Sequence, residues 1–173
     1  QNTTANHNTA LGHEALKLNT TGSENVAVGA NALDSNTSAA ENVAVGYLAL
    51  EANTTGNYNT ALGARALDAN TTAASNTAIG RLSLTNNTTG ANNTAVGHAS
   101  LSSQTTADAN TAVGVQAGQA ITTGIRNTAV GWQALYTSTT QNYNTAIGTG
   151  ALYTSVAENG TARIEFLNYA PGI

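Results

Sequence analysis

Residues 59–63 read Asn59-Thr60-Ala61-Leu62-Gly63, and this short sequence decides the fold because close copies of it recur at a constant distance. A glycine ends each copy, and each of these glycines lies 17 residues after the previous one: Gly12, Gly29, Gly46, Gly63, Gly80, Gly97, Gly114, Gly131 and Gly148. No insertion or deletion interrupts the period. A short period held over nine copies is typical of a stacked array of coils rather than of a globular domain.

The repeating unit begins with an asparagine, and its positions are numbered from that residue. Position 2 is Thr or Val, position 3 Ala, position 4 Val, Ile or Leu, position 5 Gly, positions 8–9 Ala/Ser-Leu, and positions 12–15 Asn-Thr-Thr-Gly/Ala. The nine units begin at Asn8, Asn25, Asn42, Asn59, Asn76, Asn93, Asn110, Asn127 and Asn144. We expect a β-solenoid repeat domain over residues 1–160, with a partial first coil in 1–7 and nine repeats in 8–160. Residues 161–173 are expected to form a capping or linker segment.

The composition indicates an ordered, nearly neutral surface. Only 8% of the 173 residues are charged, whereas an average domain has about 25%. The net charge is -4, and five basic residues cannot neutralise a run of phosphates, so nucleic acid is not an expected partner. No apolar run approaches the roughly 18 residues of a membrane span, so we expect no membrane insertion of this segment. The first residue already lies inside a repeat, which indicates a piece of a longer protein.

The unit favours short strands over helices. Asn, Thr and Gly are poor helix formers, and Thr and Val at alternating positions suit an extended segment that the glycine ends. The Ala-Leu stretch is expected to form a second strand, and Asn-Thr-Thr-Gly the return. Stacking of the coils turns every position into a column, and the asparagine and glycine columns are interpreted as structural ladders.

The small residues suggest an assembly. Ala and Gly at positions 3 and 5 face away from the side chains at positions 2 and 4, and a face turned to water would not need to stay that small. Because a narrow coil buries only one face, we expect the other to meet a neighbouring chain. The leucines at position 9 are expected to form part of this oligomer core, at roughly 2 kcal/mol each. Gly118 replaces leucine once and should leave a gap.

Two protein families have similar repeats. Asn-Val-Ala-Val-Gly at 25–29 and 42–46, with a small residue at position 8, resembles the head repeat of trimeric autotransporter adhesins. The full 17-residue form is similar to repeats in phage-type tail-fibre proteins and related bacterial surface proteins that end in a self-cleaving chaperone domain. This resemblance covers residues 1–160. It implies a left-handed parallel β-roll, a homotrimer around one axis, and a role in display and adhesion. Adhesin heads use shorter repeats than this chain. The resemblance therefore does not decide between a bacterial cell surface and a virion fibre as the location.

Chemical motifs are sparse in this sequence. His7, His13 and His98 occupy variable positions without a second ligand at metal spacing, so neither a metal site nor a cofactor is expected. The acidic residues also occupy variable positions, and no serine has an activating motif. We therefore expect no catalytic residue and no enzyme activity.

Variable positions are where binding could be selected. Aromatic residues gather in the last two coils, at Trp132, Tyr136, Tyr143 and Tyr153. They are candidate receptor contacts, for a host-surface glycan or protein, because exposed aromatic side chains are common anchors. Packing at the junction with the C-terminal segment is the alternative explanation, and it is slightly favoured.

The sequence is compatible with three functions, of which it favours the first. It is a non-enzymatic trimeric fibre or adhesin segment, extracellular, that extends from a cell or virion surface and displays a binding surface. The alternative is a solenoid whose stacked threonines bind ice or a crystalline polymer, through columns such as Thr20, Thr37, Thr54, Thr71 and Thr88. The third, a carbohydrate-active enzyme, requires a carboxylate pair across a groove.

Two further features give structural expectations. Position 15 alternates between alanine and glycine, at Ala5, Gly22, Ala39, Gly56, Ala73, Gly90, Ala107 and Gly124, which indicates a 34-residue pair of coils. At the C-terminus, residues 162–169 are expected to form a strand with Ile164 and Phe166 turned inward over the last coil. Such a strand would cover the open end of the sheet.

Overall fold

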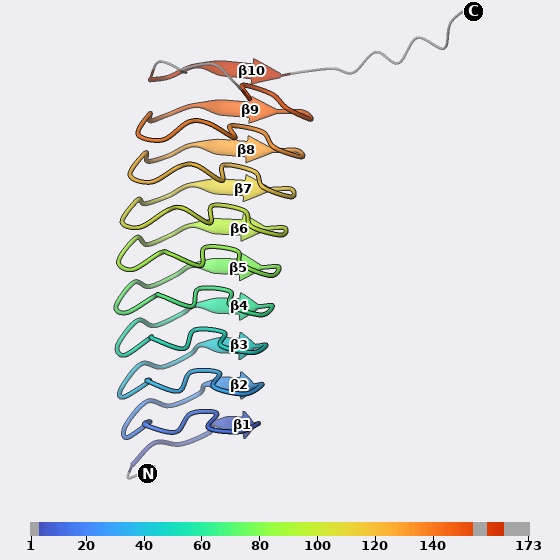
Figure 1. The fold of residues 1–173 in the computed structure, drawn as a ribbon. Helices are drawn as coiled ribbons and strands as arrows, with labels where there is room; N and C mark the ends of the chain where they lie inside the picture. The colour runs from blue at the N-terminus through green and yellow to red at the C-terminus, as the bar shows by residue number, and fades with distance from the viewer. Residues whose placement is uncertain (1–3, 154–158, 165–173) are drawn as a thin grey trace, which may run out of the picture.

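The chain folds into a stack of coils, each of which contributes one short strand to a single parallel sheet (Figure 1). The computed structural model describes residues 4–153 and 159–164, and within them it contains no helix. The ten strands are β1 Thr9–Leu11, β2 Val26–Val28, β3 Val43–Val45, β4 Thr60–Leu62, β5 Thr77–Ile79, β6 Thr94–Val96, β7 Thr111–Val113, β8 Thr128–Val130, β9 Thr145–Ile147 and β10 Ala162–Ile164. They lie in sequence order, and each residue pairs with the residue 17 positions later. The expected all-β parallel solenoid is confirmed.

The glycine after each strand is required by both conformation and space. Gly63 has a φ of +138°, which L side chains rarely adopt. A Cβ built on Gly63 would lie 2.6 Å from the carbonyl carbon of Gly80 in the next coil. The column therefore lets successive backbones approach closely at the corner where each strand ends.

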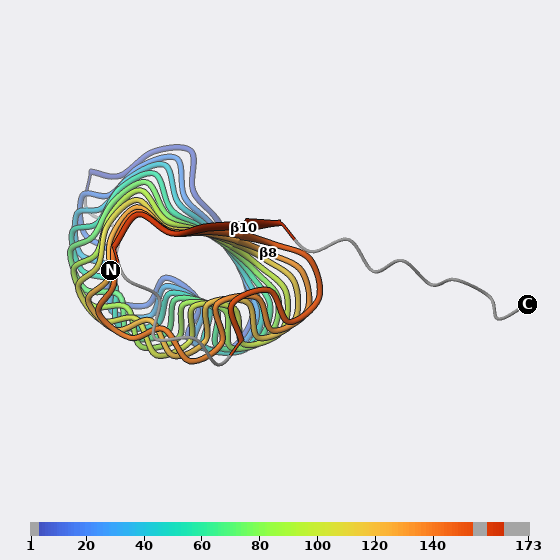
Figure 2. The ribbon, with the colours of Figure 1, turned by 90° about the horizontal axis from the view of Figure 1, so that it is seen from above.

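The expected second strand is absent from the described coils, and a series of turns takes its place. Positions 7 and 9 both have positive φ, for example Arg65 at 58° and Leu67 at 52°. The turn still bonds to its neighbours, because the amide of Leu67 donates to the carbonyl of Ser83 over 3.1 Å. Figure 2 shows the resulting elongated ring, with strands along one side and turns along the other. The prediction of a second strand is wrong because leucine rarely adopts the left-handed conformation, and nothing in the local sequence indicates that it does so here.

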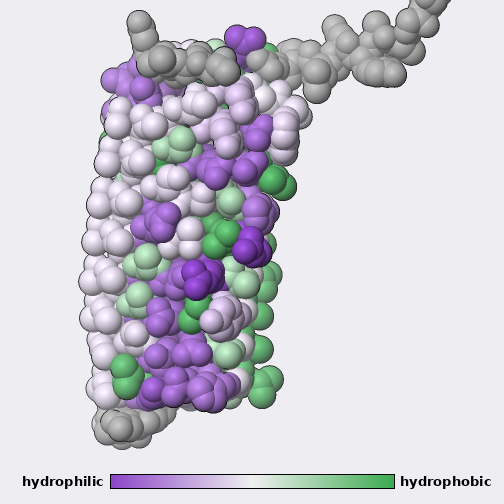
Figure 3. Space-filling model, in the orientation of Figure 1, coloured by the Kyte–Doolittle hydropathy of each residue, from purple (hydrophilic) through white to green (hydrophobic). Residues whose placement is uncertain are grey.

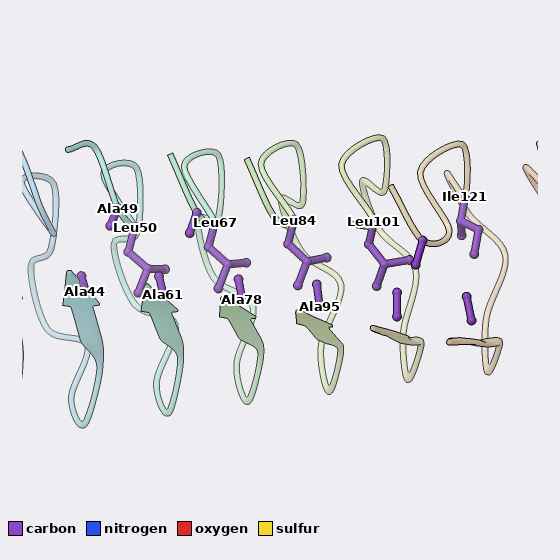
Figure 4. Close-up of a cluster of buried hydrophobic side chains, with 14 of the residues drawn as sticks. Ala44, Ala49, Leu50, Ala61, Leu67, Ala78, Leu84, Ala95, Leu101 and Ile121 are labelled. Carbon is purple, nitrogen blue, oxygen red and sulfur yellow. The ribbon is translucent and has the colours of Figure 1, made fainter. Parts of the chain in front are cut away.

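The apolar half of the interior lies between the strand and these turns. Ala61 and Leu67 are fully buried within the single chain. Figure 4 shows Leu67 and Leu84 reaching across the coil towards strand alanines such as Ala78. The expectation that the leucines form part of an oligomer core is therefore wrong, because they are buried within their own chain. Alanine points inward because the coil is too narrow for a larger strand residue opposite leucine.

The coil at 110–126 exchanges two interior positions. Gly118 replaces the leucine of position 9, and Ile121 replaces the asparagine of position 12. A Cβ on Gly118 would lie 3.0 Å from Cδ1 of Ile121 and 2.9 Å from Cδ2 of Leu101. The expected gap is thus absent, because the buried isoleucine occupies the space that leucine fills elsewhere.

The polar half of the interior consists of two asparagine ladders, at positions 1 and 12. Asn59 and Asn70 both donate a side-chain N–H to the carbonyl of Ala73, over 2.8 and 3.1 Å. The ladders also join coils, since the amide N–H of Asn76 donates to Oδ1 of Asn59 over 3.0 Å and Nδ2 of Asn70 donates to Oδ1 of Asn53 over 2.9 Å. Almost every one of these asparagines is buried and bonded, which supports the structural interpretation of position 1.

The alternation at position 15 has a steric cause. A Cβ on Gly56 would collide with the carbonyl oxygen of Ala73 in the next coil, and Gly22 and Gly90 are in the same situation. Ala73 itself is buried in a site that accepts a Cβ. Successive returns therefore differ, and the structural period is two coils.

The described part of the expected C-terminal strand is β10, Ala162–Ile164. β10 pairs with β9 in parallel, so it does cover the edge of the last repeat strand. Ile164 is 56% exposed, and it aligns with Ile147 in the outward column of the sheet. Its predicted inward orientation is wrong, because parallel pairing in register fixes which side chains face out. Residues 165–169, including Phe166, lie outside the described residues.

Candidate binding surfaces

The outer face of the sheet carries a continuous column of aliphatic side chains beside a column of mostly threonine. It consists of position 2, which is Thr9, Val26, Val43, Thr60, Thr77, Thr94, Thr111, Thr128 and Thr145, and of position 4, which is Leu11, Val28, Val45, Leu62, Ile79, Val96, Val113, Val130 and Ile147. We call these 18 side chains the outer strand face. All of them are exposed or half-buried, with Leu62 46% exposed, and none is charged. An exposed, uncharged column of aliphatic side chains of this kind is a candidate interaction site.

The alternation of positions 2–5 leaves open which strand face is inside, but the sequence contains one signal that decides it. Position 3 is alanine in all nine repeats, whereas position 4 varies among valine, isoleucine and leucine. A tightly packed interior tolerates little change of volume. The variation at position 4 therefore distinguishes the outward column from the invariant inward one.

The return face is mainly polar. Figure 3 views this face and shows hydrophilic side chains over much of its middle, with apolar side chains along the right-hand edge. Position 10 contributes Asp34, Glu51 and Asp68 in three successive coils. Burial and the neighbouring charges of Asp68 and Asp34 raise the pKa of Glu51. Burial also raises the pKa of Asp68, against the opposing influence of the Arg65 guanidinium 3.8 Å away.

The aromatic candidates occupy three different columns. Tyr136 and Tyr153 share position 10 and stack with centroids 5.0 Å apart and planes 2° apart. Tyr143 accepts a hydrogen bond from Nη1 of Arg126 over 3.0 Å, and it is 52% exposed. Trp132, at position 6, is also 52% exposed. Stacking covers one ring face in the Tyr136–Tyr153 pair, and the Arg126 guanidinium lies over the Tyr143 ring at 5.6 Å from its centroid. Trp132 is therefore the member best placed to contact a receptor.

The threonine columns differ in what their hydroxyls do. In the first column, the hydroxyl of Thr54 donates to the carbonyl of Thr71 over 3.1 Å, and other members bond in the same way. These hydroxyls therefore serve coil stacking. The second column is exposed throughout and comprises Thr21, Ser38, Thr55, Thr72, Thr89, Thr106, Thr123 and Thr140.

The Asn-Thr-Thr segments match the sequence motif for N-linked glycosylation. The acceptor atom would be the side-chain nitrogen of residues such as Asn53 and Asn70. Both residues are fully buried, and their nitrogens donate to backbone carbonyls. The folded coils therefore do not offer these nitrogens as acceptors.

Ionisable groups do not converge on a chemical centre in the part of the chain that the structure describes. That part contains no group of three or more histidines and carboxylates placed to hold a metal ion. His98 lies beside Arg81, with 3.2 Å between Nε2 and Nη1, on an exposed column. No helix of the described residues could cross a membrane.

Comparison with known proteins identifies no relative. No family model, no curated protein and no solved structure matches the chain. The class that the fold defines is a parallel β-solenoid of about nine 17-residue turns.

Proposed function

We propose that the chain is a non-enzymatic segment of a homotrimeric, extracellular fibre or adhesin, which extends from a bacterial cell or a virion and displays a receptor-binding surface. The single observation that carries this proposal is the outer strand face. It runs the length of the repeats, and its side chains would remain exposed to solvent in an isolated chain.

A second copy of the chain is the occupant that fits this face best. Copies of the chain share the 17-residue period, so equivalent side chains of two copies can align in every coil along the whole stack. Eighteen side chains are close to the roughly 20–30 residues that each partner contributes to a standard interface. The absence of charge on the face favours association of apolar surfaces. Three copies around one axis, and a left-handed coil, follow from the resemblance to adhesin heads and tail fibres.

Display follows from the dimensions of the stack. Ten strands at about 4.8 Å spacing give a rod on the order of 43 Å long. In such an assembly the outer strand face is covered, and the return face and the column of Trp132 remain available for a host glycan or protein. The rod therefore separates a self-association surface from a variable, exposed one.

Sedimentation equilibrium of the chain with two matched variants tests the assembly. Leu62→Lys places a charge on the outer strand face, whereas Thr55→Lys places the same charge on the exposed second threonine column. We expect a trimer for the parent and for Thr55→Lys, and a folded monomer for Leu62→Lys, because Leu62 is not part of the chain's own core. A parent that is a folded monomer at micromolar concentration would refute the proposal.

The alternative function, binding of ice or a crystalline polymer, is supported by the second threonine column. Its hydroxyls are exposed at regular spacing in eight successive coils. The first column is less suited, because its hydroxyls already bond within the stack. Thermal hysteresis of the parent, lost on Thr72→Lys, is the expected result for ice binding.

A further inference from the structure

The cohesion of the stack is strictly between nearest neighbours. Each strand contacts only the strands before and after it. Backbone hydrogen bonds between coils join residues 15 to 18 positions apart, such as Thr60 N–H to the carbonyl of Asn76 over 2.8 Å and Gly63 N–H to the carbonyl of Val45 over 2.8 Å. The sequence has no cysteine, so no disulfide ties distant coils together. Removal of one coil therefore leaves the bonds of all coils beyond its neighbour intact.

The hydrogen bonds between coils join neighbours along the axis of the stack. The coils stack along one axis, and the chain enters at one end of the described stack and leaves at the other (Figure 1). Tension along the chain reaches a terminal coil first, where the backbone leaves its neighbour one hydrogen bond at a time. When that coil has opened, the next one is in the same position.

Each coil is also closed on itself, which makes it the unit of opening. The side-chain nitrogen of Asn59 donates to the carbonyl of Ala73, near the far end of the same coil. Asn8 with Gly22, Asn25 with Ala39 and Asn76 with Gly90 repeat this closure. A coil that loses this bond loses the connection between its beginning and its end, so it is expected to open as a whole.

We propose that the stack is a force-extensible tether, which lengthens under axial tension by releasing one 17-residue coil at a time while the remaining coils stay folded. Seventeen residues at about 3.6 Å each span roughly 61 Å. Subtraction of the folded spacing of about 4.8 Å leaves a contour-length increment of about 56 Å for each coil. The biological meaning of this extension rests on the proposed role as an extended surface segment, but the mechanics do not.

Single-molecule force spectroscopy of the full chain, held by its two ends, tests the proposal. The parent should extend in a series of equal increments of about 56 Å. The double variant Thr55→Cys/Thr72→Cys places cysteines on exposed, stacked positions of consecutive coils. Their Cα spacing of about 4.8 Å lies within the roughly 4.4–6.8 Å that a disulfide spans. Oxidation should remove one increment, and a reductant should restore it.

The controls separate the possible outcomes. Thr55→Cys alone should keep every increment under both conditions. One rupture that releases the whole contour length, or an oxidised double variant that keeps all its increments, would overturn the proposal. Sedimentation of the same samples reports trimer formation independently, so failure of the assembly and failure of stepwise extension are distinguishable.

Discussion

Restoring the consensus in the coil at 110–126 tests whether its two unusual residues act as one unit. Two single substitutions, Gly118→Leu and Ile121→Asn, each return one position to the residue found in most other coils. Their combination returns both. If Ile121 occupies the space of the missing leucine, the double variant should be much less damaging than the two singles suggest.

The magnitudes follow from the distances around Gly118. A side chain there would press on Ile121 and Leu101, at 3.0 and 2.9 Å from the new Cβ. Overpacking of this kind costs about 1–3 kcal/mol, and a left-handed residue with a Cβ costs about 1–2 kcal/mol more. Ile121→Asn alone removes a buried apolar side chain, with a loss of about 2–5 kcal/mol.

In the double variant, leucine refills the apolar half and the new asparagine can donate to the carbonyl of Gly124, as Asn87 does to Gly90. Only the backbone term of about 1–2 kcal/mol then remains. Equilibrium urea unfolding of the four proteins gives the coupling free energy, which should be at least about 2 kcal/mol. Additivity within about 0.5 kcal/mol would refute the exchange of positions.

Three other substitutions examine the columns. Leu67→Asp should prevent folding because it buries an unpaired carboxylate. Arg65→Asp changes an exposed side chain two residues earlier and should change the melting temperature little. Equal losses of stability in the two variants would contradict the column assignment. Glu51→Gln/Asp68→Asn should raise the melting temperature at neutral pH. Burial raises the pKa of both carboxyls in the folded state, so their ionisation destabilises the fold at pH values above these pKa values. This destabilisation should vanish below pH about 4, where the carboxyls of the unfolded chain also bind protons. A difference in melting temperature that persists there would refute this cause. Gly56→Ala should destabilise the stack through the collision with the carbonyl of Ala73, and calorimetry that shows no loss would exclude that contact.

The period of the sequence predicts the coil, the strand and the ladders because each depends on residues that recur at fixed spacing. The alternation in Thr60-Ala61-Leu62 shows that two faces differ, but it does not say which face is inside. Volume decides that question. The interior must hold Leu67 opposite the strand, and only alanine leaves enough room, so the larger side chains point outward.

The candidate site was less predictable than the fold. Trp132 and Tyr143 are close in sequence, but a coil of 17 residues places positions 6 and 17 in different columns. The turns that follow each strand also escape sequence reasoning, since leucine at φ 52° has no local signal. That conformation is imposed by stacking on the neighbouring coils, which no single unit contains.

The alternation of glycine and alanine at position 15 restricts how such a protein can change its length. Loss or gain of a single coil would put two returns of the same type in contact, and a glycine site admits no Cβ beneath the next carbonyl. Recombination that moves 34 residues at once preserves this alternation, whereas a shift of 17 residues breaks it. The rod would then change its length during evolution in steps of about 9.6 Å, which is twice the strand spacing.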